Sequence, residues 1–223
     1  MVSSGCEDIS VRSRFFGNGV YPWAVDDANG ERMRRLPPGP HGLSAELVAR
    51  NQRERLISAM AEVCGERGYA DSSVAEVAKR AGVSTASFYR QFKDRKECLL
   101  VSFEELFGRL LAEIERACAG AEAPAEGRKA ALATAAALLA ADRPTARLLA
   151  VEIGAAGPDG VRALHCAIDR LAELLREPGT KAPSVARDAA WAAVAAMVSL
   201  AGLRVSEGKS PTAADLEEVA ALS

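Results

Sequence analysis

Apolar residues along this chain recur with the period of an α-helix, and no stretch shows the alternating period of a strand. Many are spaced at i, i+3, i+4 and i+7, which places them on one face of a helix that packs against a core. Two such stripes are short and lie close together between residues 73 and 92: the first is Val74, Val77, Ala78 and Ala81, and the second is Phe88 and Phe92. The pattern predicts an all-α fold containing one pair of short, closely connected helices.

The residues around these two stripes predict where each short helix begins and ends. Gly82 follows the first stripe, at a point where a residue in the left-handed conformation commonly ends a helix. Ser84 supplies an N-cap oxygen for a second helix, which runs from Thr85 to about Phe92. With its aromatic face buried, the second helix presents outward a small, hydroxylated and cationic face, made of Thr85, Ala86, Ser87, Tyr89 and Arg90.

Such a face is typical of a helix-turn-helix whose second helix lies in the DNA major groove, with its N-terminal residues on base edges. A pair of short helices is also an ordinary packing unit, in which case the outward face would carry Glu and Lys in solvated pairs. The chain has no acidic residue between Lys79 and Asp94, which favours the DNA-binding interpretation.

The flanks of the helix pair make the pattern more specific. The stretch 53–100 reads RERLISAMAEVCGERGYADSSVAEVAKRAGVSTASFYRQFKDRKECLL. Its first helix ends in ERGY, Ser-Val opens the second helix, AGVS forms the turn, FYRQF lies on the recognition helix, and a basic residue opens the next helix. In these features it resembles the N-terminal domain of the TetR family of bacterial transcriptional regulators. The resemblance implies three helices in a DNA-binding domain and about six in a C-terminal ligand-binding and dimerisation domain.

The rest of the chain is predicted to be helical by period and punctuation, about nine helices in all. We expect a flexible N-terminal arm over 1–43, a DNA-binding domain over 44–93 and a ligand-binding and dimerisation domain over 94–223. Loops are expected at 157–160 and 177–183. Helices are expected from Ser44 to 67, 94 to 120, 125 to 140, Pro144 to Ile153, Val161 to 175, Ser184 to about 205, and Ser210 to 222.

Composition changes this picture in a few respects. Residues 31–100 hold 13 Lys and Arg against 9 Asp and Glu, whereas residues 101–223 hold 13 against 17, so a net +4 is followed by a net −4. That asymmetry fits a DNA-reading domain joined to another domain. Five cysteines with no CxxC pair and two histidines argue against a disulfide scaffold, a metal site or any cofactor. No signal peptide is visible and no apolar run approaches about 18 residues, so we expect a cytoplasmic protein with no membrane contact.

The DNA contacts divide into those that position the protein and those that read the sequence. For phosphates, we expect Ser73 and Ser84 at helix N-termini; the resemblance adds Tyr89 and Arg95, with Lys96 beside it. Many family members carry Lys-Gly-Thr where this chain has Thr85-Ala86-Ser87, which shifts base reading toward Arg90, together with Thr85 and Ala86. The basic cluster Arg32-Met33-Arg34-Arg35 is either an arm for the minor groove or a solvated tail.

In the C-terminal half, the resemblance implies that the last two helices pack against their copies in a homodimer. The alternative is that they only complete the core of one subunit. The candidate interface residues are Ala192, Ala195, Ala196, Ser199, Leu203, Leu216 and Val219. Candidates for the wall of an effector pocket, each also readable as plain core, are Phe103, Phe107, Leu110, Leu148, Glu152, His165 and Trp191.

The leading hypothesis is therefore a transcriptional regulator and not an enzyme: a homodimeric repressor released from a palindromic double-stranded DNA operator by a small, largely apolar effector. The helix that starts at Arg95 is expected to transmit the signal, because it carries both a DNA-facing end and a pocket-facing end. One alternative is a thiol-based redox or lipid sensor of the same fold, with Cys118 or Cys166 as the reactive group. Another is an enzyme or small-molecule carrier whose helix-turn-helix no longer binds DNA.

Overall fold

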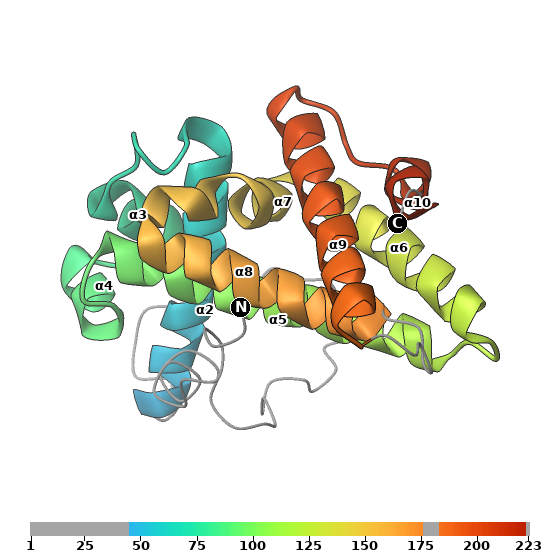
Figure 1. Cartoon of the computed structure of the whole chain (residues 1–223). Helices are drawn as coiled ribbons and strands as arrows, with labels where there is room; N and C mark the ends of the chain where they lie inside the picture. The colour runs from blue at the N-terminus through green and yellow to red at the C-terminus, as the bar shows by residue number, and fades with distance from the viewer. Residues whose placement is uncertain (1–44, 176–182, 222–223) are drawn as a thin grey trace.

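The fold is all-α, as the sequence predicts (Figure 1). The computed structural model describes residues 45–175 and 183–221, and within them side chains are described for 46–175 and 188–218. These residues form nine α-helices and one short 3-10 helix, η1. The elements are α2 (Ala45–Arg67), α3 (Val74–Ala81), α4 (Thr85–Gln91), α5 (Arg95–Ala119), α6 (Pro124–Ala141), α7 (Arg143–Ala150), η1 (Glu152–Ala156), α8 (Pro158–Leu175), α9 (Pro183–Ser206) and α10 (Ala213–Ala221). The predicted arm, 1–43, with its Arg32–Arg35 cluster, lies outside the described residues.

The predicted punctuation of the helix-turn-helix is confirmed. Ser73 and Ser84 cap α3 and α4, and Asp94 caps α5, each through a side-chain oxygen that accepts a backbone N–H of the first turn. Gly82 ends α3 with a φ of 64°, in the left-handed region that glycine tolerates without strain. These caps satisfy backbone groups at the ends of both helices, and so stabilise two helices that are short.

Helix boundaries in the C-terminal half differ from the predicted ones in four places. The helix opened by Pro144 ends at Ala150, and the next residues form η1. The loop predicted at 157–160 is much shorter, because α8 already begins at Pro158, where a proline suits the first helical position. Helix α9 begins at Pro183 and not after Ser184, and α10 begins at Ala213 and not at Ser210. At α10, the Thr212 and Asp215 side chains each accept the other's backbone N–H, which sets its start.

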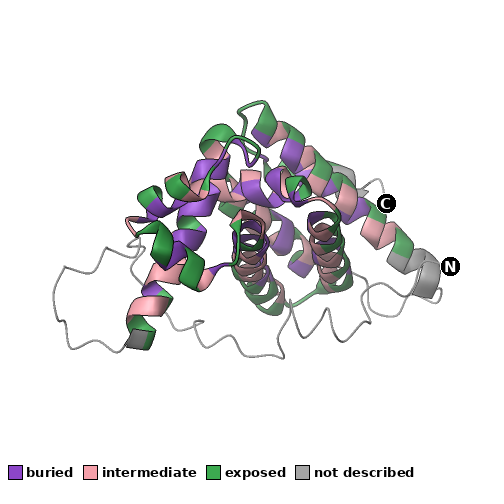
Figure 2. Ribbon diagram, turned by 90° about the vertical axis from the view of Figure 1, so that its left-hand side faces the viewer, coloured by how far each residue is buried: buried purple, intermediate pink, exposed green. Residues whose placement is uncertain are grey.

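The helices form one body in which α5 and α8 run side by side (Figure 1). Helices α2, α3 and α4, which we call the reading head, pack at one end, while α6, α9 and α10 pack at the other. Helix α7 lies between them and contacts both α2 and α9. The buried residues line the inner faces of these helices (Figure 2), and one apolar core continues from the reading head through α5 into α7 and α8.

Helix α9 contains the most apolar stretch of the described chain. Residues Asp188–Ser206 have a mean hydropathy of 1.5, so this helix is long and apolar enough to cross a membrane by length and composition alone. The expectation that no such run exists was therefore wrong. In the fold, the helix packs against α7, α8 and α10.

Candidate nucleic-acid interface and ligand cavity

Helix α4 presents most of the face that the sequence predicts. Thr85, Ala86 and Arg90 are exposed, and Tyr89 is 58% exposed, while Phe88 points into the core. The T-shaped contact between the Phe88 and Tyr89 rings, with centroids 5.5 Å apart, supports the base of the exposed tyrosine.

Ser87 departs from the prediction, because its side chain is buried and not outward. Its hydroxyl lies 3.0 Å from the Ser84 hydroxyl and accepts a hydrogen bond of 2.7 Å from Nη2 of Arg90. A short side chain one turn into a helix reaches the cap residue more readily than solvent, which periodicity alone does not reveal. Ser87 thus orients Arg90 and is not itself available to a base.

Two arginines of α2 hold the ends of the short helices. Arg55 donates to the carbonyl of Ala81, the last residue of α3, and Arg53 donates to the carbonyl of Gln91, the last residue of α4, over 3.4 Å. The Arg53 guanidinium also lies 4.9 Å from the centroid of the Phe92 ring. Cations at helix C-termini satisfy free carbonyls and complement the negative end of the helix dipole. These two arginines therefore tie the C-terminal ends of α3 and α4 to α2.

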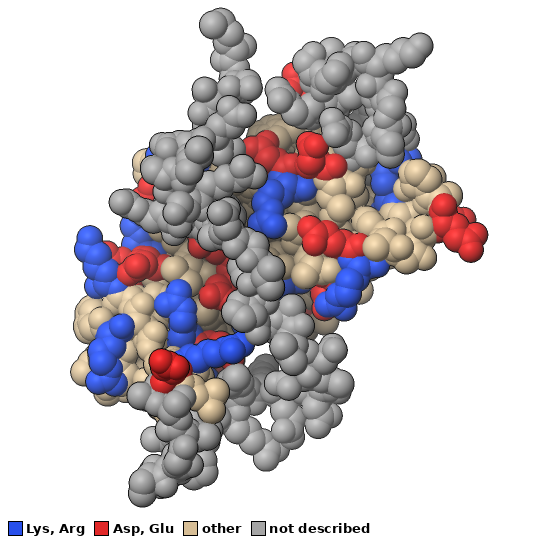
Figure 3. Space-filling view, turned by 90° about the horizontal axis from the view of Figure 1, so that it is seen from below, with Lys and Arg blue, Asp and Glu red and all other residues tan. Residues whose placement is uncertain are grey.

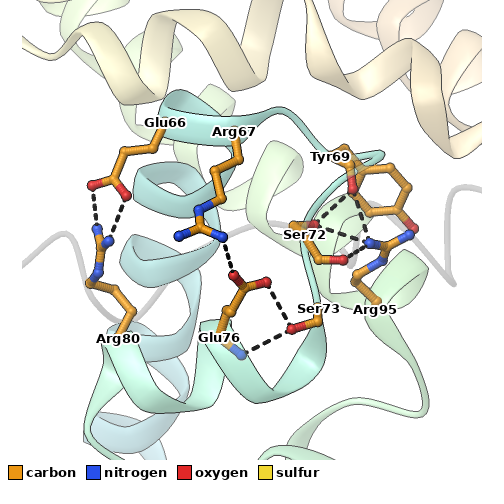
Figure 4. Close-up of polar contacts among 8 residues, drawn as sticks. All are labelled: Glu66, Arg67, Tyr69, Ser72, Ser73, Glu76, Arg80 and Arg95. Carbon is orange, nitrogen blue, oxygen red and sulfur yellow. Dashed lines mark hydrogen bonds and ion pairs between the residues drawn. The ribbon is translucent and has the colours of Figure 1, made fainter.

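A third arginine ties α3 to the end of α2 on the surface (Figure 4). Arg80 makes two parallel hydrogen bonds to the carboxylate of Glu66, of 2.8 and 2.6 Å, and a third bond of 3.1 Å to Glu62. The hydrogen bond from Arg80 lowers the pKa of Glu66. On the face seen in Figure 3, basic and acidic side chains are interspersed. The net positive charge of residues 31–100 thus forms no patch of a single sign among the described residues on this face.

Ser73 is predicted to bind a phosphate at the start of α3, but its side chain already has a partner. Its hydroxyl donates to the Glu76 carboxylate over 2.8 Å and accepts the Glu76 N–H over 3.2 Å (Figure 4). Arg67 pairs with the same carboxylate over 2.7 Å. An acidic group therefore occupies the positive end of the α3 dipole, which disfavours a second anion there.

Arg95 is predicted to bind a phosphate, yet the structure turns its side chain toward the reading head (Figure 4). Its Nη1 donates to the carbonyls of Tyr69, over 3.0 Å, and Ser72, and lies 3.2 Å from the Ser72 hydroxyl. The guanidinium also stacks over the Tyr69 ring, 4.2 Å from its centroid. Arg95 thus fixes the loop between α2 and α3. The sequence gives no periodic signal for such a long-range contact.

Lys96, the residue beside Arg95, joins α5 to α8. Its ammonium lies 2.5 Å from the carboxylate of Asp159, in the first turn of α8. The hydrogen bond from Lys96 is the main cause of a lowered pKa at Asp159. Lys96 is half-buried and paired, so it stabilises the contact between α5 and α8.

Helices of the C-terminal part line a partly open cavity of about 90 Å³ whose lining residues are all apolar. Three of the predicted wall residues, Phe103, Phe107 and Leu110, line it. Leu148, Glu152, His165 and Trp191 do not. The lining residues are Phe103, Phe107, Leu110, Ile114, Ala131, Leu132, Ala135, Leu139, Leu149, Ala150, Leu164, Ala167, Ile168, Leu171, Leu175, Val194, Met197, Val198, Ala201 and Leu216.

The four predicted wall residues outside the cavity have other surroundings. Leu148 is fully buried in the main core. His165 packs edge-on against Trp191, with ring centroids 5.7 Å apart, between α8 and α9. Glu152 is 8% exposed and accepts hydrogen bonds from Tyr69 and Arg147. Leu148 and Glu152 are thus buried away from the cavity, while Trp191 is half-buried and His165 is exposed. The sequence alone does not distinguish the hollow part of a core from its filled part or from its rim.

Helix α9 carries an exposed stripe of small and apolar residues. Ala192, Ala196, Ser199 and Leu203 are exposed along one face, and Leu203 is 55% exposed. Two other interface candidates differ: Ala195 is half-buried against a separate apolar cluster formed by α6, α8, α9 and α10, and Leu216 is buried and lines the cavity. The side chain of Val219 lies outside the described residues.

The cysteines bear on the thiol-sensor alternative. Burial raises the pKa of both Cys64 and Cys98 to about 12. Burial also raises the pKa of Cys118, which lowers the fraction of reactive thiolate. Cys166 is half-buried. Among the described residues, no three His, Cys, Asp or Glu side chains group as metal ligands would.

A capped helix-turn-helix with an exposed second helix, joined to helices that line a cavity, is the architecture of ligand-responsive helix-turn-helix regulators. Residues 56–101 match the model of the bacterial regulatory proteins of the tetR family. The match covers most of the reading head and the first turns of α5; over the rest of the chain, the likeness to regulators of this family is one of fold.

Individual relatives agree with this assignment. A fatty acid metabolism regulator protein of Bacillus subtilis (strain 168) is 36% identical over 61 residues, which is 27% of this chain and 31% of that protein. The matched stretch thus spans less than a third of the relative's length.

Solved structures extend the likeness to the whole fold. The fatty acid degradation regulator FadR of Bacillus halodurans superimposes with a TM-score of 0.64 and 24% identity, over 77% of this chain and 93% of that one. The regulator FadR of Bacillus subtilis, in complex with stearoyl-CoA, gives 0.62 and 22%, over 75% and 95%. A TetR-like regulator of Rhodococcus sp. RHA1 gives 0.62 and 21%, over 77% and 92%. At these identities the shared property is the fold.

The inward position of Arg95 leads to a stability prediction. Arg95→Ala is expected to lower the free energy of unfolding by about 1–3 kcal/mol, because it removes the hydrogen bonds to the Tyr69 and Ser72 carbonyls and the stacking on the Tyr69 ring. Arg95→Lys is expected to recover less than half of this loss, since an ammonium lacks the planar fork that reaches two carbonyls and stacks on a ring. Urea unfolding followed by circular dichroism measures both variants.

Arg116→Ala, which removes an exposed arginine at the far end of α5, is the matched control. If Arg95→Ala unfolds at the same urea concentration as the control and only weakens DNA binding, then Arg95 is the phosphate contact that the sequence predicts.

Proposed function

We propose that this chain is a homodimeric repressor that leaves its DNA operator when a long-chain fatty acyl thioester enters the cavity. The observation that carries the proposal is the cavity itself, whose twenty lining residues include no charged, amide or hydroxyl side chain. Such a lining favours a hydrocarbon chain over a polar molecule. The likeness to fatty-acid regulators, one of them bound to stearoyl-CoA, supports an acyl ligand.

The proposal assigns sequence reading to the exposed face of α4. Arg90 is the long cationic side chain there, and an arginine can bind guanine O6 and N7 together. Its contact with Ser87 holds it on the helix surface at the edge that would face the groove. Thr85 and Ala86 offer small groups to thymine methyls, and the exposed Tyr89 hydroxyl suits a phosphate oxygen. Ser84 at the helix start is a further candidate for the DNA backbone, whereas Lys96 would have to leave Asp159 to reach it.

The small size of the cavity supplies a reason for the ligand to change the protein. An engineered cavity of about 150 Å³ in another protein holds a molecule as small as benzene, whereas this one measures about 90 Å³. A long acyl chain therefore needs the surrounding helices to move apart. A ligand that binds only the expanded state shifts the population toward that state, and DNA binding weakens the ligand by the same factor.

The dimer in this proposal forms through the exposed stripe of α9. Two reading heads on a two-fold axis match two half-sites about 34–36 Å apart, which a single head cannot do. Small side chains at 192, 196 and 199 allow two helices to approach closely. The division at residues 93 and 94 then separates the DNA-reading part from the part that binds ligand and partner, and the protein works in the cytoplasm.

The base-reading role of Arg90 is tested by Arg90→Ala. Specific binding is expected to weaken by about 1–3 kcal/mol, with relaxed preference at one base pair of each half-site, because a bidentate contact is lost. Selection of bound sequences followed by fluorescence anisotropy measures both effects. Arg116→Ala removes the same charge far from α4 and serves as the control; equal losses in the two variants would show a general charge effect instead of base reading.

The dimer is tested by Ala196→Arg. A charge at the centre of the stripe meets its own copy across the two-fold axis, so we expect monomers at micromolar concentration in light scattering. Because Ala196 is exposed in the subunit, the variant is expected to stay folded. Ala112→Arg, at an exposed position of α5, is the matched control. A wild-type protein that is already monomeric would contradict the proposed interface.

The effector is tested by measuring operator affinity with stearoyl-CoA, with free CoA and with no ligand. We expect stearoyl-CoA to weaken operator binding by about 5–150-fold, the usual range of allosteric coupling, and free CoA to have no effect. Phe107→Ala removes a ring that stacks on Phe103 in the cavity wall, with centroids 6.0 Å apart. It is expected to alter this response at least about tenfold while leaving ligand-free operator affinity within about threefold.

Leu138→Ala, at the surface of α6, is the control for Phe107→Ala. An equal response to stearoyl-CoA and free CoA would rule out recognition of the acyl chain, and no response to either would rule out this effector.

A further inference from the structure

Glu152 is a buried carboxylate that joins two parts of the molecule. It begins η1, directly after α7, and is 8% exposed. Its Oε1 accepts a hydrogen bond of 2.8 Å from Nε of Arg147 on α7. Its Oε2 accepts one of 2.8 Å from the backbone N–H of Tyr69, in the loop between α2 and α3. The carboxylate thus bridges the C-terminal helices and the reading head.

The loop that receives this bridge is held from both sides. Glu152 accepts a hydrogen bond from the N–H of Tyr69. The carbonyl of Tyr69 in turn accepts hydrogen bonds from Nη1 of Arg95, over 3.0 Å, and from the Ser72 hydroxyl, over 2.8 Å. Gly68, directly before Tyr69, shapes this loop with a φ of +81°, which glycine adopts without strain; a Cβ there would lie in ordinary contact, 3.5 Å from the Glu152 carboxylate. Since Ser73 caps α3 directly after this loop, the position of Glu152 fixes where α3 begins.

At its other end the bridge is attached to the cavity wall. Leu149 and Ala150, in the last turn of α7, line the cavity, and Glu152 follows Ala150 by two residues. A displacement of that turn therefore moves Glu152. A hydrogen bond weakens steeply beyond about 3.2 Å, so a shift of about 1 Å is enough to break the bond to Tyr69.

Close packing on either side makes α7 move as a body. A Cβ on Gly65 of α2 would lie 3.0 Å from Cα of Pro144, and a Cβ on Gly202 of α9 would lie 3.1 Å from the Ala150 carbonyl. At such distances backbones are in direct contact and no side chain can yield between them. Helix α7 therefore transmits a push from the cavity instead of absorbing it.

We infer that Glu152 is a positioning residue that carries cavity occupancy to the reading head. Expansion of the cavity against Leu149 and Ala150 withdraws the carboxylate from Tyr69, and the loop that sets the start of α3 is released. The inference rests on the proposed function for its ligand, but it concerns the reach of one side chain. It adds to the route through α5, because Arg95 and Glu152 hold the two polar groups of the same peptide residue, Tyr69.

Three substitutions separate reach from charge. Glu152→Gln keeps the length and an oxygen that accepts the Tyr69 N–H, but loses the charge facing Arg147. Glu152→Asp keeps the charge, but is one methylene shorter and falls short of Tyr69. Glu152→Ala removes both. Asp159→Asn, which breaks the ion pair between α5 and α8 without touching this loop, is the matched control.

The readout is hydrogen exchange of the amides of residues 69–74 in the full-length dimer, with and without stearoyl-CoA, alongside calorimetric binding of stearoyl-CoA in the absence of DNA. In the wild type, Asp159→Asn and Glu152→Gln, the ligand is expected to speed exchange of these amides at least about tenfold. In Glu152→Asp and Glu152→Ala, exchange is expected to be fast already and to change less than about twofold, while stearoyl-CoA affinity stays within about threefold of wild type.

The opposite pattern overturns the inference. If Glu152→Asp still responds and Glu152→Gln does not, the charge pair with Arg147 matters and the reach to Tyr69 does not. A ligand response that persists in both Glu152→Asp and Glu152→Ala removes any coupling role. Because Glu152→Asp retains the buried ion pair, it provides the result if Glu152→Ala does not fold.

Failure of the proposed effector gives a different result. If calorimetry shows no binding of stearoyl-CoA to the wild type, the effector is wrong, and Ala135→Phe replaces the ligand, since it places a ring in the cavity wall from α6. Glu152 is supported as the link if Ala135→Phe speeds the exchange of residues 69–74 in the wild-type background but causes no further increase in the Glu152→Asp background. Unchanged exchange in Ala135→Phe overturns it.

Discussion

The apolar stripe of α5 packs against the reading head at one end and lines the ligand cavity at the other. The helix has 25 residues, about 38 Å at 1.5 Å per residue, and its buried side chains run from Cys98 to Ile114. Leu99 belongs to the core that supports α3 and α4, whereas Phe107 belongs to the cavity wall. Because one buried face serves both, the two halves of the chain share a core, and a change at one end has mechanical consequences at the other.

Several arginines of this region stabilise the reading head itself and do not face DNA. Arg53, Arg55 and Arg95 all spend their guanidinium groups on backbone carbonyls of the reading head. A guanidinium offers five N–H donors in one plane and stays charged when buried, whereas an ammonium has three donors and loses its charge more readily on burial. Counting positive charge therefore overstates what is available to DNA. On the exposed face of α4, Arg90 is the long cationic side chain that the described structure leaves for this purpose.

The helix-turn-helix was predictable because its signals are local. Ser73, Gly82 and Ser84 each act on a backbone within three or four residues, and the burial of Phe88 and Phe92 follows from helical period. The same reasoning gave the wrong first residue for α8 and α10, which begin at Pro158 and Ala213. In both cases several neighbouring residues can start a helix. Cap signals locate helix ends well only where one residue type dominates the turn.

The polar links could not be predicted, because they join residues far apart in sequence. Tyr69 and Glu152 are 83 residues apart, and Arg95 looks in sequence like a surface cation at a helix start. Ser87 and Leu216 were misplaced for a related reason, since period tells which face is buried but not what it is buried against. Contacts of this kind need the fold before they can be read.

The apolar lining of the cavity limits which features of a ligand this protein can distinguish. Apolar walls distinguish ligands by volume, at about 0.8 kcal/mol for each buried methylene, or roughly fourfold in affinity. They do not distinguish one head group from another. The affinity of such a cavity changes gradually with the length of the acyl chain. Any discrimination between head groups, such as a free acid and a thioester, must come from residues outside the cavity.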